Sequence, residues 1–64
     1  MCLSTVYKNS VEPKNIAMEN VMQIDLDGDT VILTDLLERK MALQGTLVTA
    51  NLVEGYVIVR EQAD

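Results

Sequence analysis

The chain has 64 residues, a length that suits one small domain spanning residues 1–64. Hydrophobic residues make up 48% of the chain, which excludes a disordered protein, and the absence of Phe and Trp means that the core has to be aliphatic. The formal net charge of -5 disfavours nucleic acids and anionic membranes as partners, because both attract clustered Lys and Arg.

The first half of the chain reads as three strands. Residues 2–8 alternate, with Leu3, Thr5 and Tyr7 on one face, and residues 9–15 are rich in turn formers. Residues 17–26 and 30–36 then predict two strands of a hairpin, joined by a tight turn at Asp27-Gly28-Asp29. This hairpin is the clearest local signal in the sequence.

The second half reads as two or three further strands. Residues 36–40 fit either one helical turn or a bent continuation of the preceding strand, and residues 39–44 predict a weak strand that ends at Gly45. Residues 46–53 and 56–61 predict two more strands, with a turn at Glu54-Gly55. The expected fold class is therefore all-β, with five or six short strands closed into a small barrel or strongly bent sheet.

Few residues in this sequence can carry chemistry. There is no His, which removes the commonest general base and metal ligand, and one Cys cannot close an intrachain disulfide. The acidic turn resembles the start of a calcium loop, but no frame places both the required Gly and the closing Glu, so we interpret it as a hairpin turn. Met22 and Met41 are predicted to fill the core. We predict no enzymatic activity.

Targeting signals are also absent from the sequence. No apolar run approaches the ~20 residues of a membrane span. The sequence also has no charged segment followed by an apolar one, the pattern that would predict a signal peptide. We therefore expect a cytoplasmic protein that does not bind membranes, in a compartment where a free thiol stays reduced.

Cys2 is the one distinctive candidate. It could be a small buried hydrophobe of the first strand. Its position favours another interpretation, because a small second residue permits removal of Met1, which leaves a free amine and a thiol on the same residue. These two groups close a five-membered chelate ring on a metal, and square-planar Ni(II) or Cu(II) favours such donors. One Cys gives one sulfur, so a two-fold dimer is needed to supply two.

The chain resembles the CooT-like family of small nickel-binding proteins, which are also described as predicted RNA-binding proteins. The resemblance covers nearly the whole chain and rests on four segments: the opening Met1-Cys2-Leu3-Ser4, the hairpin over residues 21–33, the Gly45 turn and the closing strand over residues 56–61. It implies a homodimer of SH3-like barrels that binds one Ni(II) between the subunits through Cys2. For some members it implies nickel delivery to carbon monoxide dehydrogenase.

From residues and resemblance together we expect a metallochaperone or nickel reservoir. Its metal ligand is Cys2, to which Leu3 adds a backbone amide nitrogen, and its cofactor is Ni(II). The expected partners are a second copy of the chain and a nickel enzyme such as carbon monoxide dehydrogenase, or that enzyme's maturation factors. The alternative is an RNA-binding or protein-interaction module. The acidic charge and the two Tyr, too few for a stacking platform, argue against RNA.

Overall fold

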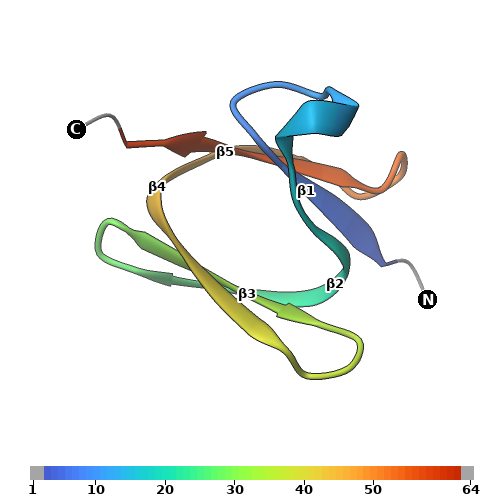
Figure 1. Cartoon of the computed structure of the whole chain (residues 1–64), viewed down its shortest axis with the longest axis horizontal. Helices are drawn as coiled ribbons and strands as arrows, with labels where there is room; N and C mark the ends of the chain where they lie inside the picture. Colours follow the sequence, from blue (N-terminus) through green and yellow to red (C-terminus); the bar gives the residue numbers. More distant parts are fainter. Residues whose placement is uncertain (1–2, 63–64) are drawn as a thin grey trace.

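The computed structural model describes residues 3–62 and confirms the all-β fold (Figure 1). Its elements follow the chain as β1 Ser4–Lys8, the single 3-10 turn η1 Pro13–Asn15, β2 Ile16–Asp27, β3 Thr30–Asp35, β4 Lys40–Asn51 and β5 Tyr56–Glu61. The five strands form a closed barrel in the order β1-β2-β3-β4-β5. Within residues 3–62, no helix is long and apolar enough to span a lipid bilayer.

Consecutive strands pair antiparallel, and the barrel closes where β1 meets β5 in parallel. The closing register runs from Thr5 opposite Tyr56 to Lys8 opposite Val59. Closure leaves β1 with a neighbour on each side, which removes the exposed edge that an open sheet of this size would present.

The predicted hairpin is confirmed. β2 and β3 pair from Val21 to Asp27, and the last pair, Asp27 with Thr30, encloses a two-residue loop. Gly28, the first residue of this loop, has a φ of 61°. Residues with a side chain rarely adopt this conformation, which two-residue hairpin loops require at their first position.

Two sequence predictions about the second half are wrong. No strand ends at Gly45, because β4 runs unbroken through it, and residues 36–39 form a tight loop instead of a helical turn or continued strand. Gly45 is the point where β4 leaves β3 and joins β5: the last β3 pair is Thr30 with Gln44, and the first β5 pair is Gly45 with Glu61. The missing side chain lets the β4 backbone pass close to the carbonyl of Arg60.

The core is aliphatic, as the composition predicts. It consists of Val6, Val21, Val31, Leu33, Leu43, Val57 and Val59. Every strand contributes to it, so the barrel interior is filled by side chains.

The prediction that Met22 and Met41 lie in the core is wrong, since 46% and 36% of their surfaces are exposed. A register shift in β2 between Val21 and Gln23 lets both Val21 and Ile24 face the core, three residues apart, and turns Met22 outward. Met41 lies opposite the buried Leu33, but near the start of β4, where it lines a surface hollow with Met18 and Arg39.

Substitution of Gly45 by Ala tests the role of this glycine. A Cβ at this position would overlap the carbonyl oxygen of Arg60, which is backbone and cannot rotate away. We expect Gly45→Ala to lower the free energy of unfolding by about 1–3 kcal/mol in urea denaturation. The neighbouring exposed Thr46→Ala serves as the control, and an equal loss in both variants would show that the close approach is not responsible.

Candidate metal-binding end of the barrel

Cys2, the predicted metal ligand, lies outside the described residues. The chain that follows it is held on both sides. Ser4 pairs with Val21 of β2, and the amide of Thr5 donates a hydrogen bond to the carbonyl of Gly55, with a distance of 2.9 Å. Ser4 is buried, whereas Leu3 and Thr5 are only partly covered. The strand that leads from Cys2 therefore starts at a defined point on the barrel.

Two loops lie at the same end of the barrel as the start of β1. The β2 partner of Ser4, Val21, also pairs with Asp35, the last residue of β3. The β5 partner of Thr5, Tyr56, also pairs with Asn51, the last residue of β4. Figure 1 shows the start of β1 and the β3–β4 and β4–β5 loops at one end of the long axis.

These two loops expose aliphatic side chains to solvent. We call the two exposed aliphatic pairs the apolar tips: Leu36 and Leu37 in the β3–β4 loop, and Leu52 and Val53 in the β4–β5 loop. The exposed fractions of these residues are 52%, 72%, 67% and 93% in that order. Scattered single apolar residues are normal on a protein surface, whereas each of these two loops exposes two adjacent aliphatic side chains. Sequence reasoning missed these apolar tips.

The β3–β4 tip is shaped by Asp35, whose side chain is buried. Its Oδ1 accepts hydrogen bonds from the amides of Leu37 and Arg39, both at 2.9 Å, and its Oδ2 accepts one from Nε of Arg39 at 2.6 Å. Burial raises the pKa of the Asp35 carboxyl, but the amide and guanidinium of Arg39 and the amide of Leu37 lower it by more, so the pKa lies below the ordinary value of 3.8. Asp35 thus holds the loop as a carboxylate.

The β4–β5 tip is shaped by Asn51 in a similar way. Its side-chain oxygen accepts a hydrogen bond from the amide of Glu54 at 2.9 Å, and its carbonyl accepts one from the amide of Gly55 at 2.8 Å. Gly55 has a φ of 81°, which ends the loop in a left-handed conformation. In both loops, the last strand residue folds its side chain over the turn and fixes the aliphatic pair in solvent.

The described residues of one chain do not form a metal site. Within residues 3–62, no three carboxylate, thiol or imidazole side chains lie together in a way that could hold an ion. Among residues 3–62, the thioether residue Met22 lines a hollow together with Ser4, the first residue of β1.

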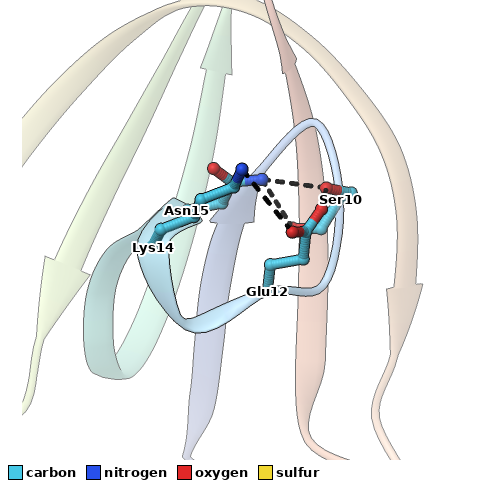
Figure 2. A network of polar contacts seen from close by, with 4 residues as sticks. All are labelled: Ser10, Glu12, Lys14 and Asn15. Atoms are coloured by element: carbon cyan, nitrogen blue, oxygen red, sulfur yellow. Dashed lines mark hydrogen bonds and ion pairs between the residues drawn. The ribbon is translucent and has the colours of Figure 1, made fainter.

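At the other end of β1, the β1–β2 loop contains a polar network (Figure 2). Ser10 donates to a carboxylate oxygen of Glu12 at 2.7 Å, Asn15 donates to Oγ of Ser10 at 2.8 Å, and Lys14 lies 3.8 Å from Glu12. These contacts join residues of one loop to each other, so they explain how the predicted loop is held rather than indicate a binding site.

The fold and its exposed apolar end define a small, closed, five-stranded β-barrel protein. The family model of the CO dehydrogenase accessory protein CooT matches residues 1–60 of the chain, which therefore belongs to this family. The crystal structure of a protein assigned as CooT from Carboxydothermus hydrogenoformans has a similar fold: the TM-score is 0.83 at 10% sequence identity, over 97% of this chain and 100% of the other. No curated protein matches the sequence.

The Asp35 carboxylate predicts a loss of stability in acid. Since its folded pKa lies below 3.8, the folded state binds the proton more weakly than the unfolded state. The stabilisation is complete above this value and is lost as the pH falls below it. We expect Asp35→Asn to be less stable than the wild type at about pH 5 and to lose less stability on acidification to about pH 3.

This expectation is measured by urea denaturation at both pH values. Asp27→Asn, at the exposed β2–β3 turn, is the matched control and should keep the acid dependence of the wild type. Parallel curves for Asp35→Asn and the wild type would contradict the role of Asp35.

Proposed function

We propose that this protein binds Ni(II) between two copies of the chain through the thiolate of Cys2, and that it delivers or stores nickel for CO dehydrogenase. The observation that carries the proposal is the match of the chain, Met1-Cys2 included, to an accessory-protein family of a nickel enzyme. The protein itself acts as a carrier in the cytoplasm and not as a catalyst.

The donor chemistry of Cys2 supports nickel as the cargo. After removal of Met1, residue 2 has an α-amine with a reference pKa of about 7.7–8.0 and a thiol with one of about 8.5. A divalent ion displaces both protons near neutral pH, and the two donors close a five-membered ring. The backbone amide of Leu3 is a further nitrogen donor, in the donor class that square-planar Ni(II) favours.

The requirement for two copies follows from the count of donors. The chain has one Cys and no His, so a single copy offers one sulfur and the nitrogens next to it. Two copies related by a two-fold axis supply two thiolates and two amines, which fill four positions around one ion. The exposed apolar tips beside the start of β1 support this arrangement, since contact between copies at this end would also bury them.

A site of this kind suits transfer. Its ligands come from a chain terminus and not from a closed cage, so an acceptor protein can replace them one at a time. A protein that passes its metal on needs ligands that can be replaced in this way, whereas a structural metal site keeps its metal because all its coordination positions are filled by the protein.

The test is a Ni(II) titration of Met1-processed protein, followed by ultraviolet-visible absorption. We expect a thiolate-to-nickel charge-transfer band that saturates at one ion per two chains. Cys2→Ala should abolish the band and stoichiometric binding. Met22→Leu, which removes the nearby thioether and keeps its volume, is the control and should titrate like the wild type.

Protein that retains Met1 provides a second comparison. It keeps the thiol but moves the free amine to residue 1, so the five-membered ring is lost and the affinity for nickel should fall. Stoichiometric binding by Cys2→Ala, or saturation at one ion per chain in the wild type, would contradict the proposal.

A further inference from the structure

The β2–β3 turn contains the single place in this sequence where an Asp is followed by a Gly, at Asp27-Gly28. In such a pair the amide nitrogen of the Gly can attack the side-chain carboxyl of the Asp and close a five-membered succinimide ring. A side chain on the second residue would crowd the attacking nitrogen, and glycine has none. The other Asp residues inside the chain precede Leu or Thr: Asp25, Asp29 and Asp35.

The structure leaves this pair accessible and outside the sheet. Asp27 and Gly28 are both exposed, and Gly28 lies between the paired residues Asp27 and Thr30, so it takes no part in the β2–β3 ladder. Chain neighbours aside, no heavy atom of residues 3–62 lies within 4 Å of the position that a Cβ of Gly28 would take. The turn can therefore rearrange locally without moving into the barrel.

The competing sites are held by hydrogen bonds. Asn9 precedes the small Ser10, but its side-chain oxygen accepts a hydrogen bond from the amide of Glu61 at 2.9 Å. Asp35 is buried, and its carboxylate accepts hydrogen bonds from the amides of its own loop and from Nε of Arg39. Neither side chain is available to attack without breaking these contacts.

We propose that Asp27 is a modification site, at which the chain isomerises spontaneously from an aspartyl to an isoaspartyl linkage. The nitrogen of Gly28 forms a bond to Cγ of the neutral Asp27 carboxyl, and the carboxyl hydroxyl leaves with the amide proton as water. A second water then opens the ring. Breaking the bond from nitrogen to Cγ restores aspartate, whereas breaking the bond to the main-chain carbonyl carbon leaves the peptide running through Cγ. One water leaves and one enters, so no oxidant or cofactor is required.

The isoaspartyl form alters a turn on which the barrel depends. It inserts one carbon into the backbone after the last β2–β3 pair and converts the main-chain carbonyl of Asp27 into a free carboxylate. The same turn is joined to the crossing point of β4, because the amide of Gly45 donates a hydrogen bond to the carbonyl of Asp29 at 2.8 Å. We therefore expect isomerisation to loosen the barrel where β4 passes from β3 to β5.

The test is to age the purified, full-length protein at mildly acidic pH. Isoaspartate is detected by methylation with protein isoaspartyl methyltransferase and S-adenosylmethionine, and it is located by peptide mapping. We expect roughly tenfold more isoaspartate at position 27 than at position 25 or 29. Asp27→Ser should abolish the signal, whereas Asp25→Ser, which removes another exposed carboxylate of β2, should age like the wild type. Circular dichroism confirms that both variants are folded.

Hydrogen exchange of the separated isoaspartyl form measures the structural consequence. The amide of Gly45 should exchange about tenfold faster than in fresh protein, because its acceptor lies in the altered turn. The amide of Thr5, which donates to the carbonyl of Gly55, is the control and should keep its rate.

Protein aged in denaturant provides the reference for an unprotected chain. Isoaspartate at position 27 in denaturant but not in the folded protein would show that the turn protects Asp27 and would overturn the proposal, as would isoaspartate formed mainly at Asn9. An unchanged exchange rate at Gly45 would overturn the proposed effect on the barrel. None of these results depends on Cys2 or on nickel, so they are independent of the proposed function.

Discussion

The parallel pairing of β1 with β5 is the constraint on which the rest of the structure depends. It joins a strand near the start of the chain to one near its end, so the barrel closes only when both are in place. The same pairing sets Thr5 against Tyr56 and thereby brings the β4–β5 loop beside the start of β1. The apolar end of the barrel is thus a consequence of closure, because its parts are far apart in the sequence.

This dependence explains which structural features the sequence predicts. The hairpin around Asp27 and Gly28 is local: its alternation and its turn residues lie within one short segment, and its prediction is confirmed. Gly45 is not local. It resembles a turn glycine in sequence, whereas its actual role is set by the carbonyl of Arg60, on a strand that only the folded barrel places there. Met22 is misassigned because a register shift in β2 reverses the faces.

The candidate site divides in the same way. Cys2 is singled out as a candidate ligand from its position next to Met1, which does not depend on the fold, and it stays a prediction. The pattern alone cannot place the two apolar tips at the same end of the barrel, because each aliphatic pair reads as the ordinary end of a strand. Their common end follows from two separate ladders that both lead to the start of β1.

A one-thiol chain that binds a metal between two copies couples its affinity to its own concentration. If the copies meet only through the ion, the entropy of association opposes binding of the second chain, and the complex dissociates on dilution. An apolar contact that forms without metal would remove that cost before the ion arrives, because the second chain is then already bound. Under the proposed function, the exposed aliphatic tips would serve such a contact, although they add nothing to the stability of an isolated barrel.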